Sequence, residues 1–456
     1  VVFVKCWLYK LKTKNNFVIP VIFLDSDLEE NKEYYREITK KLYGGDEDYR
    51  LCQEIILGIG GLRMLRELGC NIEKYHMNEG HSSLLTLEVY NELKDLEKTR
   101  EKCVFTTHTP VPAGHDQFDR KKAEEFLKEY LNNELKEKIF YQDKLNMTYL
   151  GLFFSKHING VAKKHAEVSK GMFPGYHIES ITNGVHSVFW TAEPFKKIYD
   201  KYIPNWREDP FNLRYIAGIP EEKLWEAHKK AKKKLLSFIK KKKGIKMSVE
   251  KFTIGFARRA TGYKRADLLL TDTKRLLKIA KKFEGIQIIY SGKAHPRDIE
   301  GKELIKRIFK KIKEIQDKEG IKIVYLENYD LDIAKLMTSG VDLWLNNPLK
   351  PKEASGTSGM KAAHNGIPQF SVLDGWWVEG HIENVTGWSI GSNSKENNPE
   401  EEIEDLYSKL EYIILPTYYK QRDRWIKIMK NTIAYNASFF NSHRMLQQYV
   451  LTTYFE

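Results

Sequence analysis

The sequence predicts an α/β protein with two doubly wound domains. The chain has 456 residues, which is too long for one ordinary hydrophobic core, and its 41% hydrophobic and 12% aromatic content is globular. Strand-like and helix-like patterns alternate between residues 252 and 372, as they do in parallel sheets. No apolar run approaches the roughly 20 residues that cross a bilayer. We therefore expect two Rossmann-like domains and no membrane span.

The beginning of the chain alternates like β-structure and then becomes helical. Strands are expected over Val1–Leu8 and Asn16–Asp25, and a helical run over Glu47–Leu68. That run contains Leu57-Gly58-Ile59-Gly60-Gly61, which suggests a dinucleotide fingerprint, but the third glycine would fall at Arg63. Close helix packing explains these glycines more simply.

Three polar clusters lie in or after strand-like runs of the first domain. His76-Met77-Asn78-Glu79-Gly80-His81 invites a zinc interpretation, but its spacing is one residue too long for the H-x-x-E-H pattern, and we expect no metal. His108 follows the buried run Val104–Thr107, where ligands collect at the carboxyl ends of strands; the alternative is a histidine satisfied within the core. Asn183-Gly184 supplies the left-handed geometry that a tight turn needs. The simplest interpretation of these two residues is a purely structural turn.

The second domain opens with the buried strand Phe252–Ala257, followed by Arg258-Arg259-Ala260-Thr261-Gly262-Tyr263-Lys264-Arg265. Four cations in eight residues are ordinarily a solvated turn. Their place at a strand tip, before a helix expected over Asp267–Phe283, favours a phosphate site, because arginine grips phosphate through two parallel hydrogen bonds.

The alternation then continues to the end of the sheet. Strands are expected over Gln287–Ser291, Ile321–Leu326, Val341–Asn346 and Gln369–Val372, and helices over Gly301–Lys318 and Asp332–Thr338. We expect a first domain at residues 1–245 that ends in a basic helical linker, a second at 246–420, and C-terminal helices at 421–456 that pack back on the first.

Charge and cysteine content limit the classes of partner. The net charge is +13, but the basic residues alternate with Glu and Leu in amphipathic helices, so solvated helix faces are favoured over nucleic-acid binding. The excess favours anionic substrates. The 4 cysteines are widely spaced and indicate buried thiols in a reducing cytoplasm.

The most informative stretch is Glu353-Ala354-Ser355-Gly356-Thr357-Ser358-Gly359-Met360-Lys361, with Asn365-Gly366 downstream. Its hydroxyl and glycine residues predict a loop that turns into a helix beginning near Met360 and ending at Gly366. The first N–H groups of such a helix can hold a phosphate, and Thr357 and Lys361 would share one face. In isolation, Lys361 would be one more solvated lysine.

Together, these motifs resemble those of the α-glucan (glycogen, starch or maltodextrin) phosphorylases. The order Gly359-Met360 resembles the short bacterial and archaeal branch of that family, and the resemblance extends from about Asp25 to Tyr454. It implies two Rossmann-like domains that face a cleft, the glycosyltransferase-B arrangement. It also implies reversible phosphorolysis, in which a non-reducing terminal glucose of an α-1,4-glucan passes to inorganic phosphate and gives glucose 1-phosphate with retention.

The resemblance also implies a role for each matching residue. Lys361 would hold pyridoxal 5'-phosphate as a Schiff base, with Thr357, Arg258 and Tyr329 as further cofactor residues. Inorganic phosphate would lie on Arg259 and Lys264, and His108 would hydrogen-bond the sugar at the reacting centre. The remaining sugar contacts would come from His81, Asn183, Glu353, Ser355 and Gly356.

Two other functions are left open. One is a nucleotide-sugar glucosyltransferase of the glycogen synthase kind, and the other is a non-catalytic glucan-binding protein. A homo-oligomer is compatible with the sequence, which gives neither glucan length nor regulation. In the family, a glycine-rich loop upstream of this region contacts both phosphates; we find no counterpart, and expect an N-terminally incomplete copy with little activity of its own.

Overall fold

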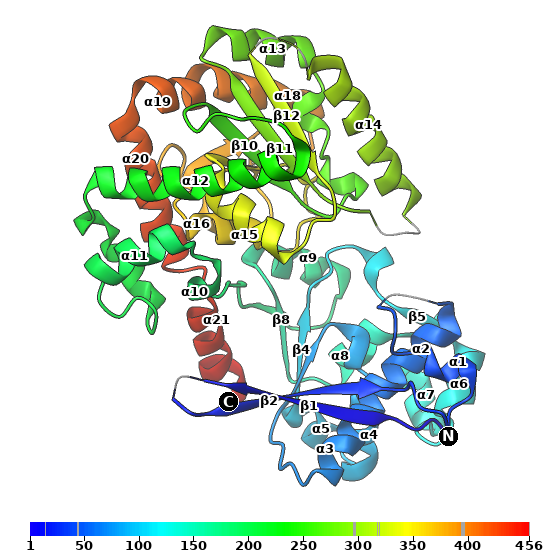
Figure 1. The fold of residues 1–456 in the computed structure, drawn as a ribbon. Coiled ribbons are helices and arrows are strands. Elements are labelled where there is room, and N and C mark those ends of the chain that lie inside the picture. The colour runs from blue at the N-terminus through cyan, green and yellow to red at the C-terminus, as the bar shows by residue number, and fades with distance from the viewer. Residues whose placement is uncertain are drawn as a thin grey trace. The chain divides into compact units, whose positions relative to one another are not determined.

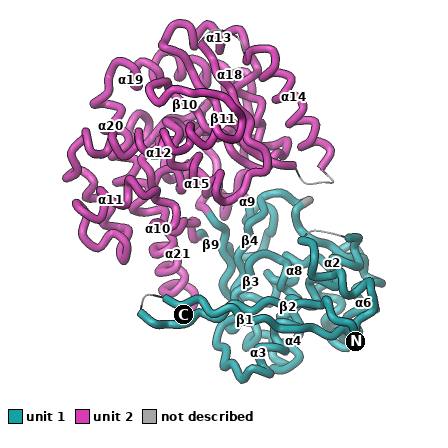
Figure 2. Tube along the Cα trace, in the orientation of Figure 1, with its two compact units in different colours: residues 1–161, 169–180, 456 teal, residues 162–168, 181–455 magenta. Residues whose placement is uncertain are grey.

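The computed structural model describes residues 1–13, 15–42, 45–294, 298–316, 318, 320–393 and 397–455. These residues form two compact units (Figures 1 and 2). Unit 1 comprises residues 1–161 and 169–180, and unit 2 comprises residues 162–168 and 181–455. The expected domain boundary at residue 245 stays a prediction. Within the described residues, no helix is both long and apolar enough to span a membrane.

Unit 1 is built on a parallel sheet in the order β3-β4-β8-β9. Its strands are β3 (Tyr75–Asn78), β4 (Cys103–Thr107), β8 (His157–Gly160) and β9 (Glu179–Ser180). Asn78 pairs with Thr106 in register, so β3 and β4 end side by side. The residues that follow them, Glu79 and His108, are therefore neighbours.

Two antiparallel elements complete the strands of unit 1. The first is a hairpin of β1 (Lys5–Lys12) and β2 (Val18–Asp25), and the second is a small sheet of β5 (Gln117–Asp119), β6 (Phe140–Tyr141) and β7 (Lys144–Asn146). The helices are α1 (Glu33–Arg36), α2 (Glu47–Ile55), α3 (Gly61–Glu67), α4 (Leu85–Leu93), α5 (Leu96–Lys102), α6 (Arg120–Leu127), α7 (Asn133–Ile139) and α8 (Met147–Phe153), followed by α9 (Lys163–Met172), whose residues are divided between the units.

The glycine-rich run of unit 1 lies inside a continuous helix. A π-helical segment, Ile56–Gly60, joins α2 to α3. A Cβ atom on Gly58 would lie 2.8 Å from the backbone nitrogen of Leu85. The prediction that these glycines serve close helix packing is confirmed at Gly58.

Unit 2 contains a six-stranded parallel sheet in the order β12-β11-β10-β13-β14-β15. Its strands are β10 (Phe252–Ala257), β11 (Ile286–Ser291), β12 (Ile321–Leu326), β13 (Leu343–Asn346), β14 (Gln369–Val372) and β15 (Gly387–Ile390). Numbered along the sheet, this is the 3-2-1-4-5-6 order of dinucleotide-binding folds, whose direction of winding reverses between β10 and β13. In such sheets, ligands bind at the carboxyl ends of the two strands on either side of the reversal.

Hydrophobic cores cover both faces of this sheet. Ile288 of β11 belongs to one buried cluster, and the next residue, Ile289, belongs to another. Because successive side chains of a strand point to opposite faces, helices must pack on both faces, as Figure 1 shows. The predicted α/β class with parallel, doubly wound architecture is confirmed.

The helices of unit 2 include a long C-terminal series. They are α10 (Ser187–Trp190), α11 (Glu193–Tyr202), α12 (Glu221–Lys243), α13 (Thr273–Lys282), α14 (Ile299–Ile315), α15 (Leu331–Gly340), α16 (Ser358–Ala363), α17 (Trp377–Gly380), α18 (Pro399–Lys409), α19 (Leu415–Lys420), α20 (Arg422–Asn431) and α21 (Ser442–Tyr449). Shorter 3-10 segments of this unit occur at Pro210–Gly218, Gly262–Lys264 and Leu268–Leu270, and π-helical segments at Leu410–Ile414, Thr432–Ala437 and Val450–Tyr454. Unit 1 has 3-10 segments at Gly80–Ser82 and Pro112–Gly114.

Candidate active site

The loop after β10 holds two neighbouring cations, of which Arg258 is buried and Lys264 is partly exposed. Arg258 directly follows the strand, and its backbone N–H donates to Ser291 O at 3.1 Å, which extends the sheet ladder. The chain then makes a 3-10 turn over Gly262–Lys264. The helix expected from Asp267 begins only at Thr273, so that part of the prediction is wrong: Asp272 caps the helix, and the residues before it form another 3-10 turn. The helix dipole therefore does not begin at this loop.

Arg258 and Lys264 face one carboxylate. Glu353 Oε2 lies 2.6 Å from Arg258 Nη2 and 3.7 Å from Lys264 Nζ. Arg258 is 8% exposed and Glu353 6% exposed. Burial, together with the charge of Arg258, lowers the pKa of Lys264 to about 7. Two basic side chains therefore lie beside a single carboxylate.

Several buried polar atoms of this region, among them Arg258 Nη1 and Ser355 Oγ, have no hydrogen-bond partner among the described residues. Buried polar groups are nearly always paired in native proteins, and an unpaired guanidinium edge is suited to an anion. Arg259, by contrast, is exposed and forms no ion pair or hydrogen bond in the described part of the chain.

The loop that carries Glu353 is fixed by its backbone. Glu353 N donates to Asp374 Oδ2 at 2.9 Å, and Trp376 N donates to Ser355 O at 2.9 Å. Gly356 has φ +82°, a left-handed conformation that favours glycine. The sharp turn at Gly356 brings the chain to Thr357, which caps α16 without a side-chain hydrogen bond.

Lys361 lies on α16, which spans Ser358–Ala363 and is shorter than the helix predicted to reach Gly366. Its Nζ lies 4.2 Å from the centroid of the Trp190 ring. Burial lowers the pKa of the Lys361 amine. Lys361 is therefore a half-buried amine beside an aromatic face, and the solvated interpretation of this lysine is wrong.

Asn365 explains why Trp190 lies there. Its amide nitrogen donates to Trp190 O at 2.9 Å and to Thr338 O at 3.0 Å, and its Oδ1 accepts from Ala192 N at 2.7 Å. This side chain joins the end of α10 to α15 and to the helix of Lys361. Sequence reasoning missed Trp190, because a tryptophan far away in the chain carries no signal of its own.

Tyr329 follows β12 after a tight turn. Asn328 has φ 57°, a left-handed conformation that asparagine tolerates better than most residues. The Tyr329 side chain packs against the core cluster that contains Ala257 and Ala362. Burial raises the pKa of Tyr329 to about 12, against the opposing charge of Arg258, so the hydroxyl stays protonated.

The Asn183 turn also belongs to unit 2. It precedes α10. Arg444 of the C-terminal helix α21 contacts the backbone carbonyl of Asn183, and Glu379 accepts from the Thr182 hydroxyl. Trp376 and Trp377 of the adjacent Asp374–Gly380 stretch are 1% and 0% exposed and pack on Met360 and Phe440. They are core residues.

Two of the predicted site residues, His81 and His108, belong to unit 1. His108 Nε2 contacts Asn78 Oδ1, and burial lowers the pKa of the ring to about 4, which leaves it neutral at pH 7. Glu79, at φ 68°, accepts the His108 N–H at 2.5 Å and the Thr109 hydroxyl at 3.1 Å. Glu79 thus fixes the backbone of His108.

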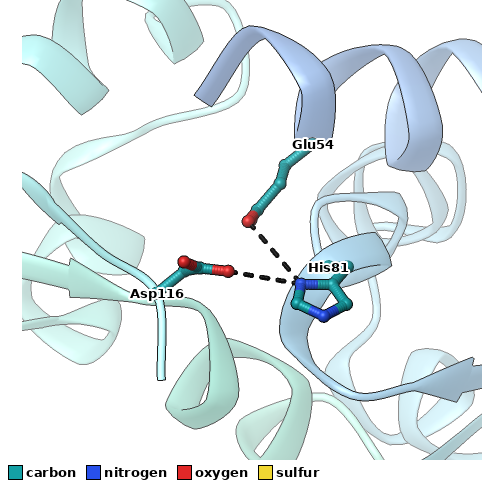
Figure 3. A group of neighbouring side chains, drawn as sticks. All are labelled: Glu54, His81 and Asp116. Carbon is teal, nitrogen blue, oxygen red and sulfur yellow. Dashed lines mark ion pairs between the residues drawn. The ribbon is translucent and has the colours of Figure 1, made fainter. Parts of the chain in front are cut away.

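His81 lies in a charged cluster with Glu54 of α2 and Asp116 (Figure 3). His81 Nδ1 is 3.2 Å from Asp116 Oδ2 and 4.0 Å from Glu54 Oε1. Hydrogen bonds to these carboxylates raise the pKa of His81 to about 9. Arg50 also contacts both carboxylates, at 2.9 Å from Asp116 Oδ2 and 3.2 Å from Glu54 Oε1. His, Asp and Glu are residue types that bind metal ions, but here a guanidinium supplies the positive charge that a metal ion would supply.

Comparisons with known proteins agree with these motifs. Residues 104–398 match the sequence model of the Phosphorylase family, described as carbohydrate phosphorylase. The chain is 41% identical to maltodextrin phosphorylase of Thermococcus litoralis over 95% of its own length and 57% of the relative. It is 36% identical to glycogen phosphorylase of Aquifex aeolicus over 98% of its own length and 73% of the relative. It is 32% identical to glycogen phosphorylase of Mycobacterium tuberculosis over 95% of its own length and 57% of the relative. The chain thus spans about half to three quarters of these relatives.

Proposed function

The chain belongs to the carbohydrate phosphorylase family, and we propose that it acts in the reversible phosphorolysis of an α-1,4-glucan. Glucose from the non-reducing end would pass to inorganic phosphate and give glucose 1-phosphate with retention. The observation that carries this proposal is the pair of cations at the reversal of the sheet, formed by buried Arg258 and partly exposed Lys264, in which one edge of the Arg258 guanidinium is unpaired. Family membership favours neither a nucleotide-sugar transferase nor a non-catalytic glucan-binding protein.

We also propose pyridoxal 5'-phosphate as the cofactor, held by Lys361, Thr357, Arg258 and Tyr329. The donor set suits it: a half-buried amine with a lowered pKa, the face of Trp190 beside it, and the unpaired Nη1 of Arg258. Arginine binds phosphate through directed N–H groups, and an aromatic face suits a planar ring. When bound, the cofactor supplies a second phosphate group that exchanges a proton with the substrate phosphate.

The chemistry then needs few protein groups that transfer protons. Inorganic phosphate donates a proton to the glycosidic oxygen, the C1–O bond breaks through an oxocarbenium-like state, and a phosphate oxygen bonds to C1. Arg259 and Lys264 would hold this phosphate, and their charges would offset repulsion between nearby anions. For Lys264 to hold this phosphate and Arg258 to hold the cofactor phosphate, both side chains must exchange their pairing with Glu353 for pairing with a phosphate group.

The proposed sugar contacts include a histidine, His108, that burial keeps neutral. Neutral His108 can donate or accept a hydrogen bond without introducing charge beside the reacting carbon. By the family resemblance, Asn183 would bind the hydroxymethyl group of the terminal glucose. His81, Glu353, Ser355 and Gly356 would bind other hydroxyl groups of the glucan. The proposed partners are glycogen, starch or maltodextrin, together with phosphate and glucose 1-phosphate. We propose a cytoplasmic location, without nucleic acid or membrane partners, and leave homo-oligomerisation open.

The test is to incubate the full chain with pyridoxal phosphate, reduce it with borohydride and map the modified peptide. We expect the label on Lys361 and slow but measurable glucose 1-phosphate release from maltodextrin and phosphate. Lys361→Ala should lose both label and activity but keep its unfolding temperature. The control is Lys352→Ala, which removes an exposed lysine of the same loop and should change neither. Full activity of Lys361→Ala with normal cofactor content would refute the assignment.

A further inference from the structure

The turn that carries Asn183 is held by a guanidinium from the C-terminal end of unit 2. Arg444, on α21, donates from Nη1 to Thr182 O at 2.5 Å and from Nη2 to Asn183 O at 3.0 Å. Its Nε donates to Phe439 O at 2.9 Å, which fixes the guanidinium to the segment before its own helix. One planar group therefore binds two consecutive carbonyls of the turn.

The start of α21 is joined to the same turn by backbone contacts. Val185 N donates to Phe440 O at 3.2 Å, and Ser442 N donates to Val185 O at 3.0 Å. A Cβ atom on Gly184 would lie 2.1 Å from Asn441 O, so only glycine permits this approach. The turn and the helix start form one rigid corner.

A carboxylate holds the other side of the turn. Thr182 Oγ1 lies 2.9 Å from both oxygens of Glu379, which also accepts the Lys163 N–H at 2.9 Å. Burial lowers the pKa of Arg444 to about 10, against the opposing charge of Glu379, so Arg444 stays cationic at neutral pH. Its hydrogen bonds to the carbonyls are therefore charge-assisted.

We propose that Arg444 is a positioning residue that sets specificity for the terminal sugar by fixing the direction of the Asn183 side chain. Two carbonyls bound to one planar fork fix the peptide planes on both sides of the Asn183 Cα atom, and with them the Cα–Cβ bond of Asn183. Lysine has a single ammonium group and cannot reproduce this fork. The inference rests on the proposed function, in which Asn183 binds the hydroxymethyl group of glucose.

The experiment compares glucose 1-phosphate with xylose 1-phosphate, which lacks the hydroxymethyl group, in the direction of glucan synthesis. The wild type should prefer glucose 1-phosphate. Arg444→Lys should reduce that preference by about tenfold or more through kcat/KM for glucose 1-phosphate, with xylose 1-phosphate and phosphate kinetics unchanged. Asn183→Ala should have the same effect, and the double variant should lose no more than Asn183→Ala alone. The control is Arg424→Lys, an exposed arginine of α20.

Several results would overturn the proposal. Arg444→Lys could keep the preference while Asn183→Ala loses it, or it could weaken both sugar phosphates equally, as a merely structural role would. A second measurement needs no activity: hydrogen exchange at the Val185 amide of the full chain should accelerate in Arg444→Lys and in Arg444→Gln relative to Arg424→Lys. Unchanged exchange would refute the positioning of the Asn183 turn by Arg444. A wild type without any sugar-phosphate turnover would refute the proposed function, and the exchange result would then decide whether Arg444 positions the turn.

Discussion

Removing the Glu353 carboxylate should make the stability of unit 2 depend on phosphate. In Glu353→Gln, Arg258 and Lys264 lose the anion that lies 2.6 and 3.7 Å from them. Burial opposes ionisation of Glu353, but the charges of Arg258 and Lys264 prevail and lower its pKa, so the wild type carries a carboxylate here. Leaving a buried ion without its partner costs about 3–5 kcal/mol.

Phosphate should return much of this loss, because it replaces the missing anion. A ligand at 100 times its Kd stabilises the native state by about 2.7 kcal/mol. In the wild type, phosphate must compete with Glu353 for the same cations, whereas in Glu353→Gln the cations are unpaired. We therefore expect phosphate to stabilise the variant more than the wild type, by about 1.5–3 kcal/mol, the contribution of a charge-assisted hydrogen bond.

The measurement is urea unfolding of the full chain at pH 7, in phosphate and in chloride at matched ionic strength. Glu402→Gln is the control, since Glu402 forms a comparably buried pair with Arg265, at 2.5 Å, in the same unit. That variant should be destabilised without specific recovery in phosphate, because Arg265 keeps hydrogen bonds to two carbonyls. Equal recovery of both variants would refute the reasoning.

Three further predictions concern single residues of unit 2. Burial lowers the pKa of Lys264 from 10.5 to about 7, so between these pH values the unfolded chain binds more protons than the folded chain. The free energy of unfolding should therefore rise with pH across that window, and Lys264→Met should flatten the rise in urea titrations. Gly359→Ala would place a Cβ 1.5 Å from Gln369 Oε1 and should cost about 1–3 kcal/mol by calorimetry, whereas Gly218→Ala, in open space, should cost less than about 0.5 kcal/mol. Arg259→Ala should lower kcat/KM for phosphate at least about a hundredfold without changing stability, because Arg259 is exposed; unchanged phosphate kinetics would place the phosphate elsewhere.

Much of the sheet of unit 2 could be predicted from the sequence, because its buried strands are continuous apolar runs between turns. Phe252–Ala257, Ile321–Leu326 and Gln369–Val372 have the predicted bounds. The helix after Lys264 could not be placed, since its apolar pattern begins before its cap. The pattern Leu268-Leu269-Leu270 is buried in a 3-10 turn, and Asp272 starts the helix by accepting Arg275 N at 2.9 Å.

The candidate site was predictable where its residues form short motifs and was not predictable where they meet through the fold. Glu353, Thr357 and Lys361 could be identified together because they occupy one loop and one helix. Arg444 could not, because it acts on Asn183 from 261 residues away through backbone carbonyls, which leave no trace in the sequence. The pairing of Arg258 with Glu353 was missed for the same reason, since it joins the residue after β10 to the loop between β13 and α16.

Burial lowers the pKa of both Lys361 and Lys264, but their neighbours give the two amines different roles. Lys361 has an aromatic ring beside its amine, and burial lowers its pKa despite the attraction between a cation and the ring. A larger neutral fraction is what an amine needs to react with an aldehyde. Burial and the charge of Arg258 also lower the pKa of Lys264, but the negative charge of an incoming phosphate would raise that pKa again. The same low-dielectric interior therefore favours a nucleophile at one lysine and, once an anion arrives, a cation at the other.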